Sequence, residues 1–182
     1  DLAFGDGKIF AATGAGIYSA DQTNTGLAYF GNWNLLSDFP VPYGKYTSVV
    51  YSGNKLYANL AVQNASGDYI YSYDGTPVLF SYIPGIYNRS FESSSDGFII
   101  TASSSVKQYD SGGSVIRSIE SSQWPNPDFS QVIESNGEIW IADRASGLLR
   151  YLNSNTITPF TLPGPLTNNA FYISSTDGKT II

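Results

Sequence analysis

The chain has 182 residues, a length that fits one domain, and a net charge of −6, which argues against nucleic-acid binding because that needs clustered Lys and Arg. It contains no His and no Cys, so Ser-His-Asp triads, Cys-His pairs and the common zinc sites are excluded. Carboxylate pairs and oxygen-ligand calcium sites stay open, and no apolar run has the ~18 residues that a membrane-spanning helix needs.

A two-residue turn followed by a short apolar strand recurs five times along the chain. The first residues of these strands are Lys8, Lys55, Phe98, Glu138 and Lys179, which lie 40 to 47 residues apart. Asp-Gly and Asn-Gly suit type I′ turns, because both central residues need a positive φ, so each copy predicts a β-hairpin. The five turns are Asp6-Gly7, Gly53-Asn54, Asp96-Gly97, Asn136-Gly137 and Asp177-Gly178.

A second apolar block follows the first four hairpins and predicts a third strand in each repeat. The blocks are 17–21, 70–74, 106–110 and 148–152. A weaker fourth strand is expected at 78–80, 115–119 and 157–160. Asp21, Asp74 and Asp110 end three of the third strands. They could suggest calcium, but the Asp-x-Asx-x-Asx-Gly spacing is absent, so we interpret them as turn-forming residues and expect no metal site.

Four antiparallel strands in each repeat of about 40–45 residues predict an all-β protein, a β-propeller of four-stranded blades. Both faces of the second strand are apolar, which suits a blade covered by neighbours on both sides. We expect Ile9, Leu56, Ile99 and Ile139 on one face, and Phe10, Tyr57, Ile100 and Trp140 on the other. The alternative is a sandwich or barrel made from one meander, but it leaves the in-phase recurrence unexplained. No helix is expected, since no long segment has a 3.6-residue period.

The repeats predict one partial propeller domain over residues 1–182, with about four and a half blades. Their approximate bounds are 1–36, 46–83, 89–120, 128–162 and, incomplete, 169–182. We expect an open arc cut from a larger propeller, whose apolar end faces pair with the remainder of its own polypeptide or with a second copy.

The longer loops are expected to share one rim, because blade-to-blade crossings and second-to-third-strand loops leave a meander on the same side. Loops on a rigid scaffold commonly carry function, and Trp, Tyr and Arg are favoured in contact surfaces. The candidate contact residues on this rim are Trp33, Tyr43, Tyr87, Arg89, Trp124 and Arg144. The alternative interpretation is that these side chains fill gaps between the blades.

Three segments carry a family resemblance: DGKIFAATGAGIYSAD (6–21), SGNKLYANLA with DYIYSYDG (52–75), and SNGEIWIADRASGLLRY (135–151). They resemble the two-component-regulator propeller repeats of exported Bacteroidota proteins. Within that group, YTSVVYSGNKLYANLA (46–61) and YIYSYDGT (69–76) look most like PorZ-type surface components of the type IX secretion system.

This resemblance implies a non-enzymatic binding or scaffold module, exported to the cell surface or periplasm, without a cofactor. Its implied partners are surface polysaccharide or lipopolysaccharide and secretion-system proteins. The alternative that the same repeats imply is a periplasmic glycan-sensing propeller of a hybrid two-component system. A propeller glycosidase or lyase is a third alternative. The lyases of this fold use His, which the chain lacks.

Overall fold

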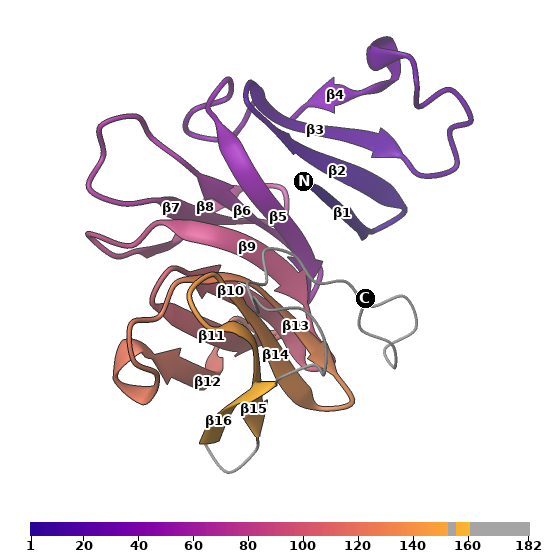
Figure 1. Cartoon of the computed structure of the whole chain (residues 1–182). Helices are drawn as coiled ribbons and strands as arrows, with labels where there is room; N and C mark the ends of the chain where they lie inside the picture. Colours follow the sequence, from indigo (N-terminus) through magenta and orange to yellow (C-terminus); the bar gives the residue numbers. More distant parts are fainter. Residues whose placement is uncertain (153–155, 161–182) are drawn as a thin grey trace. The chain divides into compact units, whose positions relative to one another are not determined.

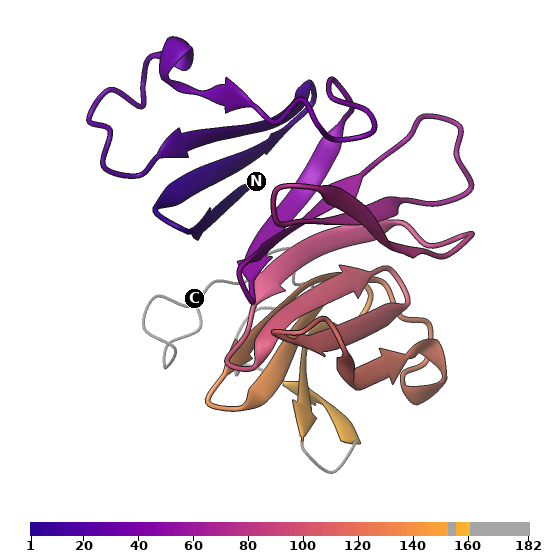
Figure 2. The same cartoon turned by 180° about the vertical axis from the view of Figure 1, so that it is seen from behind.

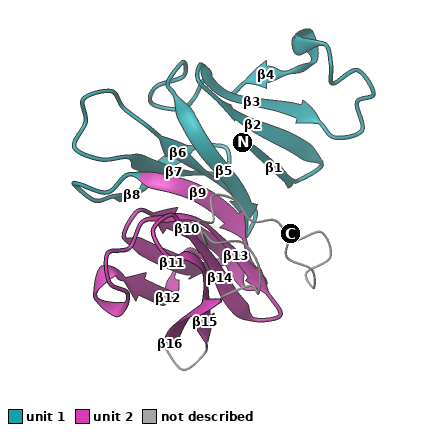
Figure 3. Cartoon of the chain, in the orientation of Figure 1, with its two compact units in different colours: residues 1–87 teal, residues 88–182 magenta. Residues whose placement is uncertain are grey.

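A computed structural model describes residues 1–152 and 156–160 of the chain. The chain divides into two compact units, residues 1–87 (unit 1) and residues 88–182 (unit 2), coloured separately in Figure 3. Within the described residues, no helix has the length and apolarity required to cross a lipid bilayer.

Unit 1 contains two four-stranded antiparallel sheets, and in each the strands pair in chain order, as Figures 1 and 2 show from opposite sides. A 3₁₀ turn, η1 (Phe30–Asn32), precedes the short β4. The first sheet consists of β1 (Leu2–Gly5), β2 (Lys8–Thr13), β3 (Gly16–Asp21) and β4 (Asn34–Leu35). The second consists of β5 (Tyr46–Ser52), β6 (Lys55–Leu60), β7 (Tyr69–Tyr73) and β8 (Pro77–Tyr82).

Unit 2 repeats this arrangement with two more four-stranded meanders. A second 3₁₀ turn, η2 (Ser121–Gln123), lies between its sheets in the chain. The third sheet consists of β9 (Asn88–Ser93), β10 (Gly97–Ala102), β11 (Ser105–Asp110) and β12 (Val115–Glu120). The fourth consists of β13 (Phe129–Ser135), β14 (Glu138–Asp143), β15 (Gly147–Leu152) and β16 (Thr156–Phe160). The all-β prediction with four-stranded antiparallel sheets is therefore confirmed, and the expected incomplete blade at 169–182 lies outside the described residues.

Three of the predicted hairpin turns have the positive φ angles that a type I′ turn requires. They are Asp6-Gly7 (51° and 68°), Gly53-Asn54 (56° and 62°) and Asn136-Gly137 (53° and 75°). The fifth predicted turn, Asp177-Gly178, lies outside the described residues.

The turn predicted at Asp96-Gly97 is wrong by one residue. Ser94 and Gly97 exchange backbone hydrogen bonds of 3.0 and 3.3 Å, so the two central residues are Ser95 and Asp96, and β10 begins at Gly97. Neither central residue has a positive φ. A Cβ on Gly97 would lie 2.4 Å from the carbonyl oxygen of Tyr109, so a close backbone approach, rather than a left-handed turn, requires glycine there.

This one-residue slip reverses the predicted faces of β10, because strand side chains alternate. Ile99 and Ile139 lie together in the core between the third and fourth sheets. In unit 1, Phe10 and Leu56 lie together in the core between the first and second sheets. Ile99 therefore corresponds to Phe10. Ile100 therefore points away from that core, and the prediction that grouped it with Phe10 is wrong.

Each unit buries an apolar core between its two sheets. The core of unit 1 is centred on Phe10, Ile17, Phe39 and Leu56, with β1 and β2 of the first sheet in contact with β5 of the second. The core of unit 2 consists mainly of β-branched and leucine side chains, with two aromatic rings. Its residues are Ile99, Val106, Ile119, Phe129, Val132, Ile139, Ile141, Leu149 and Tyr151. β-branched residues pack well on pleated surfaces, which explains why these strands form here.

Candidate functional site

A one-residue bulge recurs near the start of the first strand in three of the four sheets. The register shifts leave Thr47, Arg89 and Ser130 without a partner residue in β6, β10 and β14. A bulge re-aims a side chain that strict alternation would place on a sheet face. The bulges lie beside the loops that were predicted to form the functional rim, which we call the crossover rim of each unit. Alternating hydrophobicity does not encode a bulge, so no sequence pattern predicted it.

The bulged residues make different polar contacts at this rim. In unit 1, the side-chain nitrogen of Asn59 donates to the Thr47 hydroxyl at 2.7 Å and to Oδ2 of Asp68 at 2.9 Å. In unit 2, the Ser130 hydroxyl donates to the carbonyl oxygen of Ala142 at 3.0 Å. The guanidinium of Arg89 reaches further and joins the loop before β13.

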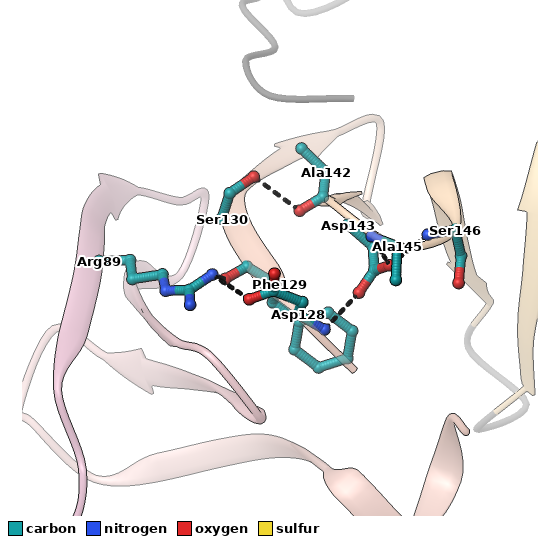
Figure 4. A network of polar contacts seen from close by, with 8 residues as sticks. All are labelled: Arg89, Asp128, Phe129, Ser130, Ala142, Asp143, Ala145 and Ser146. Carbon is teal, nitrogen blue, oxygen red and sulfur yellow. Dashed lines mark hydrogen bonds and ion pairs between the residues drawn. The ribbon is translucent and has the colours of Figure 1, made fainter. Parts of the chain in front are cut away.

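Asp143 is the centre of the crossover rim in unit 2, as Figure 4 shows. Its side chain is fully buried at the end of β14, and its carboxylate accepts three backbone N–H groups. Asp128 donates to Oδ2 at 2.7 Å, while Ala145 and Ser146 donate to Oδ1 at 2.9 and 2.6 Å. The carboxylate thus ties the β12–β13 crossing to the β14–β15 loop.

Arg89 holds the other side of the same crossing. Its Nη1 lies 2.6 Å from Oδ1 of Asp128 and donates to the carbonyl oxygen of Phe129 at 2.7 Å. The side chain is only partly exposed, so its role in this structure is to fix the start of β13. Arg89 is thus engaged within the rim, which agrees better with the alternative that these side chains fill gaps between the blades than with a free contact residue.

Trp124 and Arg144 lie on the same crossover rim in unit 2. The indole N–H of Trp124 donates to the Ser146 hydroxyl at 3.1 Å, and the ring packs against the core of unit 2. Arg144 is exposed, and its backbone N–H donates to the carbonyl oxygen of Asp128 at 3.0 Å. Of the three candidate residues in unit 2, Arg144 is therefore the one most available to a partner.

In unit 1, Tyr43 lies at the tip of a tight turn in the β4–β5 crossing and is 74% exposed. The turn closes through a hydrogen bond of 2.8 Å from the backbone of Gly44 to the carbonyl oxygen of Val41. The buried Tyr46 hydroxyl donates to the same oxygen at 3.2 Å. Burial, with a smaller contribution from Tyr71, raises the pKa of Tyr46 to about 12, so this donor stays protonated at neutral pH.

Tyr87 lies in the β8–β9 connection and is 54% exposed. Its hydroxyl donates to the carbonyl oxygen of Ala65 in the β6–β7 loop at 3.1 Å. That loop is in turn joined to the β4–β5 crossing, because the backbone of Ala61 donates to Lys45 at 2.9 Å. Tyr43 and Tyr87 therefore share the crossover rim of unit 1, as predicted.

The placement of Trp33 on that rim is wrong. It lies between β3 and β4, since β4 begins only at Asn34, which pairs with Ser19. The third-to-fourth-strand loop leaves the sheet at the opposite end, beside the Asp6-Gly7 hairpin. The indole N–H of Trp33 donates to the carbonyl oxygen of Leu27 at 2.9 Å, so the side chain orders its own loop. The sequence did not reveal a strand as short as two residues.

The opposite rim of unit 1, where the hairpin turns lie, contains a cleft of about 250 Å³ that no sequence pattern predicted. We call it the hairpin cleft. Phe10, Leu36, Leu56, Tyr51 and Tyr73 are its apolar and aromatic residues. Its other residues lie in or directly beside the turns: Asp6, Lys8, Asn54, Asp74 and Gly75. They lie far apart in sequence, in segments that each look like an ordinary turn.

The strand-ending aspartates take part in turns and ion pairs. Asp21 accepts from the backbone and the hydroxyl of Thr23 at 2.8 and 2.6 Å, which is an Asx turn. Asp110 accepts from the backbone of Ser114 at 2.8 Å, and Asp74 lies 3.3 Å from the ammonium of Lys55. In the part of the chain that the structure describes, no group of three or more acidic side chains is arranged to hold a metal ion.

Comparison with solved structures places the chain among β-propeller domains. It matches the extracellular domain of the putative one component system BT4673 from B. thetaiotaomicron with a TM-score of 0.71 and 13% identity, over 99% of this chain and 25% of that one. It matches PorZ, described as an essential bacterial surface component of the type IX secretion system of Porphyromonas gingivalis, with a TM-score of 0.63 and 18% identity, over 95% of this chain and 22% of that one. Regucalcin from Agrobacterium tumefaciens, a calcium-binding protein, matches with a TM-score of 0.58 and 16% identity, over 85% and 56% of the two chains.

No family model and no curated protein sequence matches the chain. The chain spans about a quarter of the length of the BT4673 domain and of PorZ. At these identities the comparisons establish the fold, which is that of part of a β-propeller. The neighbours include an extracellular domain that is also described as part of a putative hybrid two component system, and PorZ, so both groups that the sequence motifs resemble are represented.

Proposed function

We propose that this chain is part of a non-catalytic β-propeller that serves as a binding or scaffold module of an exported protein. The observation that carries the proposal is the propeller fold itself, which nearly the whole chain shares with an extracellular domain and a bacterial surface component. Propellers present loops on rigid sheets, and the exposed Tyr43, Tyr87 and Arg144 provide contact groups on such loops.

The hydrogen bonds and the ion pair that the carboxylates form support a non-catalytic role. Asp143 accepts three backbone N–H groups, and Glu138 forms an ion pair with Arg150. Glu92 accepts from the side chain of Gln131 at 2.9 Å. Carboxylates engaged in this way position strands and loops, and they are poorly placed to attack or protonate a glycosidic bond.

The finer role that we propose is that of a PorZ-like component of type IX secretion at the cell surface. Its partners are then the rest of its own polypeptide, secretion-system proteins and anionic lipopolysaccharide. Arg144 suits a phosphate or carboxylate group of such a partner, because a guanidinium offers a fork of donors. Tyr43 adds a rigid, largely exposed ring in unit 1.

The experiment measures binding of the 182-residue chain to immobilised lipopolysaccharide by biolayer interferometry. We expect Arg144→Ser and Tyr43→Ser each to weaken binding by at least about threefold, and Lys8→Ser, a charge-matched control on the hairpin rim, to leave it unchanged. Equal losses in Arg144→Ser and Lys8→Ser would indicate a general charge effect and overturn the assignment to the crossover rim. Turnover of a glycoside by the purified chain would overturn the non-catalytic role.

A second candidate is the sensing domain of a hybrid two-component system, which recognises a small ligand outside the cytoplasm. The hairpin cleft favours it, since a scaffold role alone does not require a concave site with aromatic walls. The two roles lead to different expectations for the purified chain. A sensing domain would bind a small molecule, and a secretion component would bind macromolecular partners.

A further inference from the structure

We propose that the hairpin cleft of unit 1 is a binding site for a small, uncharged saccharide. The inference rests on the proposal that the chain is a binding module, but the hairpin cleft lies at the rim opposite to the crossover rim, and no residue of the crossover rim lines it.

The interior of the cleft is preorganised. The ring of Tyr51 stacks on Phe10, with the ring centroids 5.8 Å apart and the planes at 8°. On the Gly5 side there is no room for a side chain, because a Cβ on Gly5 would lie 2.0 Å from the Tyr51 ring. On the other wall, Tyr73 stacks on the buried Phe39 at 5.2 Å. Both tyrosines are thus held by packing and need not reorganise when a ligand binds.

The polar residues at the mouth offer both donors and acceptors. Asp6, Lys8 and Asn54 make no side-chain hydrogen bond or ion pair within the described residues, so a carboxylate, an ammonium and an amide are available together. Asp74 is paired with Lys55 at 3.3 Å and borders the same opening. Burial raises the pKa values of Tyr51 and Tyr73, so both hydroxyls remain protonated donors at neutral pH.

This arrangement selects for an uncharged ligand. An anion would lie beside Asp6 and Asp74, and a cation would lie beside Lys8 and Lys55. A neutral polyol can donate to the carboxylate and accept from the ammonium through neighbouring hydroxyl groups. Its C–H face can contact the apolar floor formed by Leu36 and the small exposed part of Phe10. A pyranose combines these two surfaces.

The size of the cleft limits the ligand to one or two sugar rings. Its volume of about 250 Å³ is slightly below the ~300–1,000 Å³ of sites for drug-sized ligands. A longer glycan would have to bind by its end, with the remaining rings in solvent.

The test uses the 182-residue chain and isothermal titration calorimetry, supported by saturation-transfer NMR. The probes are glucose, galactose, mannose, N-acetylglucosamine and cellobiose, with glucuronate and glucosamine as charged counterparts of glucose. We expect saturable binding of at least one neutral sugar, and binding of the charged counterparts weaker than that of glucose by about fivefold or more. Absence of saturable binding by every neutral probe, or tighter binding of a charged one, would overturn the proposal.

Variants assign the binding to the cleft. Tyr73→Ala should weaken it by about tenfold, and Lys8→Trp, at an exposed strand position, should block the opening while leaving the core intact. Tyr51→Phe keeps the stacked ring and should weaken binding through the hydroxyl alone. Val115→Ser, at an exposed position of β12 in unit 2, is the control and should bind like the unmodified chain. Unchanged sugar binding by Lys8→Trp would refute the location of the site. If Lys8→Trp loses sugar binding but still binds lipopolysaccharide, the saccharide site is distinct from the surface of the proposed function, so the two proposals can fail independently.

Discussion

Replacement of Asp143 by Ala should destabilise unit 2 more than any other removal of a carboxylate discussed above. The substitution leaves the backbone N–H groups of Asp128, Ala145 and Ser146 without their acceptor at a fully buried position. Hydrogen bonds to a charged group contribute ~1.5–3 kcal/mol each, but water can enter the emptied space and recover part of the loss. We therefore expect a decrease of about 3–5 kcal/mol in the free energy of unfolding, a large part of the ~5–15 kcal/mol typical of a domain.

Two further substitutions test the cause of this effect. Asp143→Asn can keep the oxygen that accepts from Ala145 and Ser146, but it loses the acceptor for the backbone of Asp128. We therefore expect the free energy of unfolding to decrease by about 1–2 kcal/mol. Asp110→Ala removes one acceptor, for the backbone of Ser114 at an exposed position, and should cost about 1 kcal/mol or less.

Urea unfolding followed by tryptophan fluorescence measures these differences. Trp124 and Trp140 lie in unit 2, and Trp124 bonds to Ser146 within the same network. A Trp33→Phe background removes the tryptophan of unit 1, so that the signal reports on unit 2. If Asp143→Ala costs no more than Asp110→Ala, the three backbone hydrogen bonds do not stabilise the rim, and the account of its rigidity is wrong.

Burial raises the pKa of Glu92 above its ordinary 4.5, so the folded chain binds the proton more tightly than the unfolded chain. The free energy of unfolding therefore falls as the pH rises from 4.5 through the raised pKa. Urea midpoints measured across this range should decline less for Glu92→Gln than for the unmodified chain. Gly5→Ala places a Cβ against the Tyr51 ring and should cost about 1–3 kcal/mol by overpacking, as measured by thermal unfolding. Gly7→Ala meets no atom within 4 Å but requires a φ of +68°, so a loss of about 1 kcal/mol is expected, and a larger loss than for Gly5→Ala would contradict this reasoning. Arg89→Lys cannot reproduce both contacts of the guanidinium and should lower the urea midpoint, whereas an unchanged midpoint would show that the ion pair contributes nothing.

The architecture was predictable because turn chemistry and apolar alternation coincide in each repeat. Asp6-Gly7 and Asn136-Gly137 specify their hairpins through positive φ angles that few other residues adopt. At Ser95-Asp96-Gly97 the sequence offers two adjacent two-residue turns, and the strand pairing chooses the first. A local motif cannot distinguish these registers, since the difference lies in which residues pair across the sheet.

The candidate site was predicted less well, because a contact residue is defined by what surrounds it. Arg89 and Tyr43 both belong to sequence segments rich in Pro and aromatics, yet Arg89 lies in β9 and is engaged by Asp128, whereas Tyr43 is exposed in a loop. Phe39 lies in the same loop as Tyr43 and is buried in the core of unit 1. The hairpin cleft combines segments that are separated by tens of residues, so no sequence window contains it.

The recurring bulge allows the chemistry of a rim to change without a change in the core. The residue inserted at 47, 89 or 130 stands outside the in-and-out alternation of its strand, so its side chain is not one of the groups that the neighbouring sheet must accommodate. The chain already has three solutions at this position: a hydroxyl that accepts from an amide, a guanidinium that spans to the next crossing, and a hydroxyl that donates to a carbonyl group. Repeats that share one packing scheme can therefore diverge independently at their edges, and a propeller of such repeats can acquire a new surface one residue at a time.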